Sequence, residues 1–194
     1  VFSTPTVRLL ITMVFVTEAF GWAHDTILPV MARDELRAGA SGLGYLLAAG
    51  SAGGTVSTLL LASAGDVGRK SRLLVAGSFG FGLFLILFAW SSTLALSLVL
   101  IAGAYASAIV YETTVTTLLQ TEVPDDLRGR VVSFQAMMWG VTGLAGFHTG
   151  AIAGALGAPA AISMGGAVVV MSAVWVARIS GRFDTASAPS EANR

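Results

Sequence analysis

Two glutamates, Glu18 and Glu112, stand inside long runs of apolar residues, where a carboxyl group can do chemistry. A charged side chain at the centre of a membrane span costs about 2.5–3.5 kcal/mol unless it contacts a partner, water or a proton. Because a low-dielectric environment disfavours the charged form, each glutamate is a candidate for exchanging a proton or for binding a cationic group of a substrate. The alternative for both is a structural hydrogen bond, and for Glu112 also an ion pair with an arginine beyond the end of its span.

Further polar and aromatic residues lie on the same runs. Asp25 follows Glu18 by seven residues, which places both on one face of a regular helix, and His24 adjoins Asp25. The competing interpretation is that Asp25 and His24 reach the outer membrane surface, and that His148 is a hydrogen-bonded core histidine. The candidates for a proton-coupling or substrate-binding cavity are three acids and two aromatic residues: Glu18, Trp22, Asp25, Tyr111 and Glu112.

The sequence lacks the motifs of common metal and catalytic sites. The two histidines stand in different runs without a His-Glu-x-x-His spacing, and the chain has no cysteine. The segment 65–70 departs from the nucleotide-binding pattern G-x-x-x-x-G-K-[ST], and no serine stands in a G-x-S-x-G turn. We therefore expect no metal, no cofactor and no enzymatic activity. A lipid-modifying membrane enzyme using Glu112, His148 or Asp25 as acid and base is a weaker alternative.

The elements that carry these residues are predicted to be membrane-spanning helices. Hydrophobic residues make up 55% of the chain and charged residues 11%, against roughly 25% charged in soluble domains. The apolar runs have the length of about 17–25 residues that a helix needs to cross a bilayer, and they lack the period-two alternation of barrel strands. The predicted fold is all-helical, with six transmembrane spans at 9–31, 43–64, 73–90, 94–119, 131–154 and 158–179.

The loops between these spans differ in charge. Two basic residues, Arg33 and Arg37, belong to one set of alternate loops, whereas the other set is richer in arginine and lysine. By the positive-inside rule the richer set, and with it both ends of the segment, is predicted to be cytoplasmic. The formal net charge of zero gives no indication of a nucleic-acid partner. We expect 1–181 to form one transmembrane unit and 182–194 to form a disordered cytoplasmic tail, since the tail has little apolar surface.

A first charged loop resembles the loop signature of the major facilitator superfamily. In that signature Asp, a basic residue, Gly and Arg recur between paired helices. Here Asp66, Gly68 and Arg69 match, while Val67 replaces the basic residue with a shortened spacing and Ala62 stands at a usual glycine position.

A second charged segment, 120–130, carries a closer resemblance to that superfamily. Pro124, Arg128, Gly129 and Arg130 match the loop between the tenth and eleventh helices of a drug and siderophore efflux branch, which includes enterobactin-exporter-like and macrolide-efflux-like proteins. The resemblance implies a role for both loops in cytoplasmic gating. Arg128 or Arg130 would pair with Asp66 in one conformation and release it in another. The alternative is that the arginines only set the membrane orientation.

The resemblance also implies what the whole protein does. The six spans would be the C-terminal half of a twelve-helix transporter, paired with an N-terminal six-helix half of the same polypeptide or with a second copy. The expected function is secondary active export of a hydrophobic or amphiphilic small molecule, drug-like or siderophore-like, by proton antiport with alternating access.

The partners expected on this basis are the small-molecule substrate, protons and membrane lipid, in a cell membrane that we expect to be a bacterial inner membrane. In many members of the branch an asparagine stands where this chain has Glu112. That difference makes Glu112 a candidate for a coupling or specificity of its own. A non-transporting assembly or sensor protein is the alternative function.

Overall fold

The computed structural model describes residues 5–65, 70–122 and 125–183, and in these ranges it consists of helices joined by short turns, with no strand. The all-helical prediction is confirmed. The elements in chain order are α1 (Pro5–Val16), η1 (Thr17–Gly21), η2 (Trp22–Thr26), α2 (Leu28–Val30), η3 (Met31–Glu35), α3 (Gly39–Ala64), α4 (Lys70–Ala89), α5 (Leu94–Glu122), α6 (Asp125–Leu156) and α7 (Ala158–Phe183).

Five helical segments within the described ranges are long and apolar enough to cross a membrane: Val7–Glu35, Gly39–Ala64, Lys70–Ala89, Leu94–Thr121 and Ala158–Ile179. They correspond to five of the six predicted spans. The remaining span, 131–154, lies in α6, which has 32 residues but is less apolar because glycines and polar residues such as Gln135, Thr142 and His148 interrupt it. The chain is therefore a polytopic helical membrane protein, and six is an approximate number of spans.

The first span is helical throughout but irregular. A π-helical segment, η1, follows α1, and a 3₁₀ segment, η2, comes next. Pro29 lies in the first turn of α2, where its missing N–H needs no partner, and a second π-helical segment, η3, ends the span. π-Helical turns inside α-helices occur frequently at functional sites. Three of the candidate residues, Glu18, Trp22 and Asp25, lie in η1 and η2.

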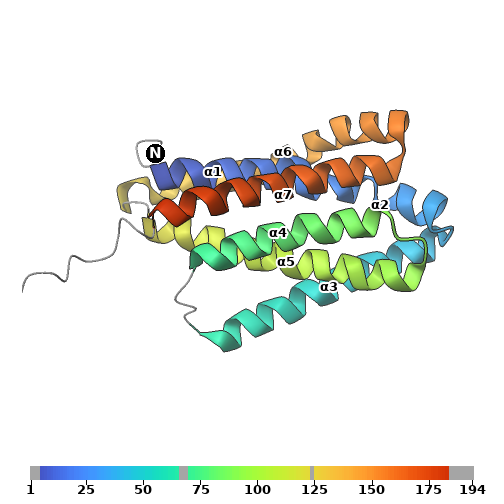
Figure 1. Cartoon of the computed structure of the whole chain (residues 1–194), viewed down its shortest axis with the longest axis horizontal. Helices are drawn as coiled ribbons and strands as arrows, with labels where there is room; N and C mark the ends of the chain where they lie inside the picture. Colours follow the sequence, from blue (N-terminus) through green and yellow to red (C-terminus); the bar gives the residue numbers. More distant parts are fainter. Residues whose placement is uncertain (1–4, 66–69, 123–124, 184–194) are drawn as a thin grey trace, which may run out of the picture.

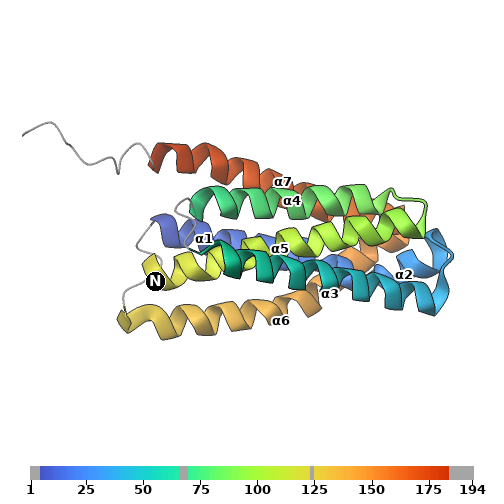
Figure 2. The same cartoon turned by 90° about the horizontal axis from the view of Figure 1, so that it is seen from below.

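The helices run side by side, and α5 lies between α3 and α4 (Figure 1). It packs against α3 on one side and α4 on the other, and α4 packs in turn against α7. The first span contacts α5, α6 and α7, and α6 follows it along one edge of the bundle (Figure 2). Residues of the first span thus face α5, which carries Tyr111 and Glu112.

Two apolar cores fill the bundle, one toward each end. One contains Phe81, Leu85 and Phe88 of α4 together with residues 27–32 of the first span. The other contains residues 7–14 of the first span together with Leu74 and Val115. Between these two stretches of the first span lie residues 17–26, whose buried polar side chains include Thr17, Glu18 and His24. The polar part of the interior is therefore enclosed by an apolar core on either side.

Candidate functional site

The structure brings Glu18 and Glu112 together from two different spans. Glu18 lies in η1 and is only 6% exposed, and Glu112 lies in α5 and is half-buried. The two carboxyl groups interact electrostatically. Because two carboxylates repel each other, holding them close in a low-dielectric interior favours a state in which the pair binds a proton or a cation.

Trp22 and Tyr111 complete a cluster around these acids. The Trp22 side chain lies near the Glu112 carboxyl group, and the Tyr111 side chain interacts with Glu18, Glu112 and Thr17. Trp22 Nε1, the Tyr111 hydroxyl and Thr17 Oγ1 are all buried with no partner at direct hydrogen-bond geometry. Buried polar groups are normally paired, so these three groups leave hydrogen-bonding capacity beside the acids unused.

Close helix packing fixes the position of Tyr111. A Cβ atom added at Gly77 of α4 would lie 2.7 Å from the Tyr111 backbone nitrogen. Only glycine fits this distance, so α4 approaches α5 closely at the residue before Glu112. The Tyr111 and Glu112 side chains both interact with residues of the first span.

Asp25 lies in a second polar cluster, at η2. The Tyr105 hydroxyl, from α5, donates a hydrogen bond to Asp25 Oδ1 over 2.5 Å. His24 Nε2 lies 3.3 Å from the same oxygen, and the Asp25 side chain is 44% exposed while that of His24 is 1% exposed. The His24 imidazole is buried between the first span, α4 and α5.

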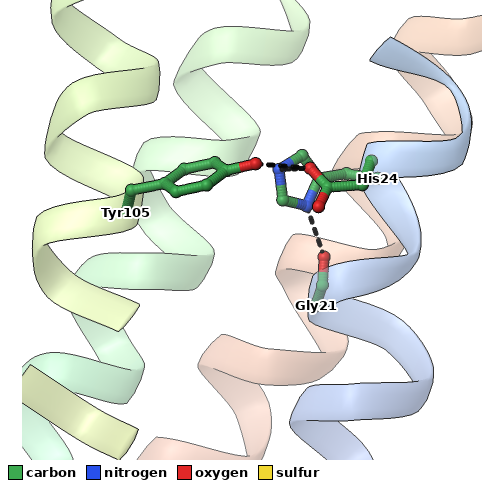
Figure 3. Close-up of polar contacts among 4 residues, drawn as sticks. Gly21, His24 and Tyr105 are labelled. Carbon is green, nitrogen blue, oxygen red and sulfur yellow. Dashed lines mark hydrogen bonds and ion pairs between the residues drawn. The ribbon is translucent and has the colours of Figure 1, made fainter. Parts of the chain in front are cut away.

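The His24 imidazole is held by two kinds of contact. Its Nδ1 lies 2.7 Å from the Gly21 backbone oxygen, a bond within one turn of the irregular helix (Figure 3). Its ring packs edge-to-face against Tyr105, with centroids 5.9 Å apart, and against Phe81 at 6.0 Å. Gly21 allows this packing, since a Cβ there would lie 2.6 Å from the Phe81 ring.

Trp22 connects the two polar clusters. Its ring centroid lies 5.2 Å from that of Tyr105 in an edge-to-face arrangement and 6.0 Å from that of His24 in a stacked one. The same side chain interacts with Glu112. A change at one cluster can therefore alter the packing at the other through a single indole ring.

The structure brings four of the predicted site residues together and places the fifth, Asp25, beside two residues that are not among the predicted ones. Glu18, Trp22, Tyr111 and Glu112 come together, while Asp25 pairs with His24 and Tyr105. His24 and Tyr105, which are not among the candidate cavity residues of the sequence analysis, are the two partners of Asp25. A signal was present for Tyr105, because it precedes Glu112 by seven residues and so lies near the same face of a regular helix.

Other predicted residues lie apart from these clusters or outside the described residues. His148 is half-buried on α6, and its ring centroid lies 5.2 Å from that of Phe20. Several predicted gating residues lie outside the described residues: Asp66, Gly68, Arg69 and Pro124. The same holds for the side chains of Arg128 and Arg130 and for residues 184–194, whereas Gly129 lies within α6. In the described part of the chain no group of three or more His, Cys, Asp or Glu side chains could hold a metal ion.

A cavity of about 350 Å³ lies between α3, α4 and α5. Thr113 and Thr114, which directly follow Glu112, contribute to its wall. Its lining is mainly apolar with several hydroxyl groups, a composition that suits an amphiphilic molecule. The residues that line it are Thr58, Leu61, Ala62, Gly65, Lys70, Leu73, Thr113, Thr114 and Thr117.

A multi-span helical bundle with buried acids shared between two of its spans is an arrangement typical of membrane transporters. The sequence matches the model of the transmembrane secretion effector family, of the major facilitator type, over residues 2–192, and the chain belongs to this family. Comparison with curated proteins and with solved structures found no match. The protein is thus a multi-pass membrane protein with a transport or secretion role, and membership in a transporter family implies a non-enzymatic one.

Proposed function

We propose that this chain is the C-terminal half of a secondary active transporter that exports a hydrophobic or amphiphilic small molecule, drug-like or siderophore-like, in exchange for protons. The observation that carries the proposal is the pairing of Glu18 and Glu112 between the first span and α5. A family of transporters and a buried acid pair together favour proton coupling, because intramembrane acids commonly form proton pathways.

The acid pair would alternate between two charge states. With one proton bound, the repulsion between Glu18 and Glu112 is relieved, and the buried Trp22 and Tyr111 donors can turn to the remaining carboxylate. Without the proton, the two negative charges repel each other, which changes the contact between the first span and α5 and favours the other conformation of the transporter. Because proton binding and proton release drive this change in opposite directions, proton entry can be coupled to export of a substrate bound elsewhere in the cavity.

The substrate would bind near the membrane midplane, between this half and its partner half. Thr113 and Thr114, which follow Glu112 in α5, line the cavity between α3, α4 and α5, and its apolar surface suits an amphiphilic molecule. The irregular η1 and η2 segments give the first span a place to change shape as the halves rock. The two charged loops would form the gate on the cytoplasmic side. Their gating residues are Asp66, Gly68, Arg69, Pro124, Arg128, Gly129 and Arg130.

Efflux from proteoliposomes tests this function. The protein, together with its partner half where that is a separate chain, is reconstituted and given a pH gradient, and export of a panel of fluorescent dyes, macrolides and siderophores is measured. We expect at least one of them to move uphill, and Glu18→Gln and Glu112→Gln to abolish this movement. The matched control is Glu35→Gln, an exposed glutamate in η3.

Wild-type rates in both Glu18→Gln and Glu112→Gln would show that neither acid couples transport to protons. Binding of panel compounds without any gradient-driven movement would instead favour the non-transporting sensor alternative. Turnover of lipid by the purified protein without a gradient would favour the membrane-enzyme alternative.

A further inference from the structure

The second polar cluster, at η2, has a hydrogen-bonding pattern that is incomplete without one more proton. The Gly21 backbone oxygen can only accept a hydrogen bond, so His24 Nδ1, 2.7 Å away, must carry the hydrogen of that bond. In a neutral imidazole only one ring nitrogen is protonated. His24 Nε2 is then left with a lone pair.

That lone pair faces a carboxyl oxygen. His24 Nε2 is buried without a hydrogen-bond partner, and Asp25 Oδ1 lies 3.3 Å from it. An ionised carboxylate has only acceptor lone pairs, and the hydrogen that Tyr105 of α5 donates to Oδ1 is used in that bond and is not available to Nε2. Two acceptors at this distance repel each other, and because Nε2 is buried away from water, a proton between the two atoms stabilises the contact.

We propose that His24, Asp25 and Tyr105 form a proton-binding site in which one proton is shared between His24 Nε2 and Asp25 Oδ1. With the proton bound, the site is neutral overall, as a protonated imidazole beside a carboxylate or as a neutral imidazole beside a carboxylic acid. When the proton leaves through the exposed side of Asp25, the site keeps one negative charge, and the Tyr105 hydroxyl stabilises it. The inference deepens the proton coupling proposed above and rests on it only for the role of the site in transport.

The groups that surround the His24 imidazole are consistent with His24 and Asp25 as the pair that shares the proton. Tyr105 of α5 and Asp25 face His24, and Phe81 of α4 contributes an apolar ring. Other elements of the described chain also pack against η2. In η1, Glu18 interacts with Glu112. On α6, His148 contacts the Phe20 ring, and α7 contributes the apolar Val169 beside Gly21. Trp22 lies between the two acid clusters, so the charge state of each can influence the other.

Nitrogen NMR of the histidines tests the site without any transport measurement. The chain has two histidines, so ¹⁵N-histidine labelling of the protein in lipid nanodiscs, with His148→Gln for assignment, isolates the signals of His24. We expect Nδ1 to stay protonated across the pH range and Nε2 to lose its proton in a single step. Asp25→Asn should move that step to lower pH by on the order of one unit, because the negative partner of the imidazolium is removed.

Two further variants fix the assignment. Tyr105→Phe should move the step to higher pH, because the carboxylate loses a donor that stabilises its charged form. Tyr45→Phe, a matched change at an exposed tyrosine of α3, should leave the step unchanged. The proposal is overturned if His24 carries its hydrogen on Nε2 rather than Nδ1 in its neutral form, or if Asp25→Asn and Tyr105→Phe both leave the step in place. If the wild-type protein exports none of the panel compounds but His24 shows the expected NMR response, the result counts against the proposed function and not against this site.

Discussion

The Tyr105 hydroxyl donates a 2.5 Å hydrogen bond to Asp25 Oδ1 and so joins α5 to the 3₁₀ turn of the first span. The same two helical segments meet again where Glu112 interacts with Glu18. These two polar connections lie on one pair of spans and share the Trp22 ring between them. Protonation at either connection therefore acts on the contact between the first span and α5.

Tyr105→Phe should weaken the fold by a small amount. The ring and its packing against Trp22 remain, and only the hydrogen bond to Asp25 is lost. Side-chain hydrogen bonds in transmembrane bundles contribute on average about 0.6 and at most about 1.7 kcal/mol. The substitution should therefore lower the free energy of unfolding by an amount of this size. Unfolding by SDS titration measures it, with Tyr45→Phe as the control; a loss well above this range would mean that Tyr105 has a packing role that the bond does not explain.

Gly77→Ala should separate α4 from α5. The new Cβ would lie 2.7 Å from the Tyr111 backbone nitrogen, and a backbone atom cannot move aside as a flexible side chain can. Overpacking of this kind costs about 1–3 kcal/mol, and export should fall as Tyr111 and Glu112 shift. Gly44→Ala is the control, since a Cβ there meets nothing within 4 Å. Equal thermal stability of the two variants would show that the close approach at Gly77 is not needed.

The spans were predictable because hydropathy follows directly from composition along the chain. The helices extend beyond the predicted limits, as in Gly39–Ala64 against 43–64, because a helix continues into the polar headgroup layer where apolar residues are no longer required. The sequence indicated Glu18 and Glu112 as two separate buried acids but not that they lie near each other. Which span faces which depends on side-chain packing between distant segments, and one sequence does not contain that information.

The cluster at Asp25 shows what the spacing of residues in the sequence does not determine. The sequence argument assumed a regular helix from Glu18 to Asp25, whereas η1 is π-helical and η2 is 3₁₀. The two helix types turn by different angles per residue, so a spacing of seven no longer places two side chains in the same direction. Asp25 consequently meets Tyr105 and His24 instead of joining Glu18.

The cytoplasmic gate gives a prediction that rests on the resemblance of the two loops. If Asp66 pairs with Arg128 or Arg130 in one conformation, Asp66→Arg should impair export, and combining it with Arg128→Asp or Arg130→Asp should restore a large part of it. A double-mutant cycle on export rates measures the coupling. Additive losses in both combinations would mean that these charges do not pair and that the arginines serve orientation alone.

The role of the acid pair in coupling can be separated from its role in binding by Glu112→Gln. In proteoliposomes, two rates are compared for the same substrate: uphill export driven by a pH gradient, and exchange of labelled for unlabelled substrate with no gradient. If the Glu18 and Glu112 pair binds the coupling proton, Glu112→Gln should lose uphill export and keep exchange near the wild-type rate. Uphill export at the wild-type rate in this variant, or loss of both rates to the same extent, would contradict the account.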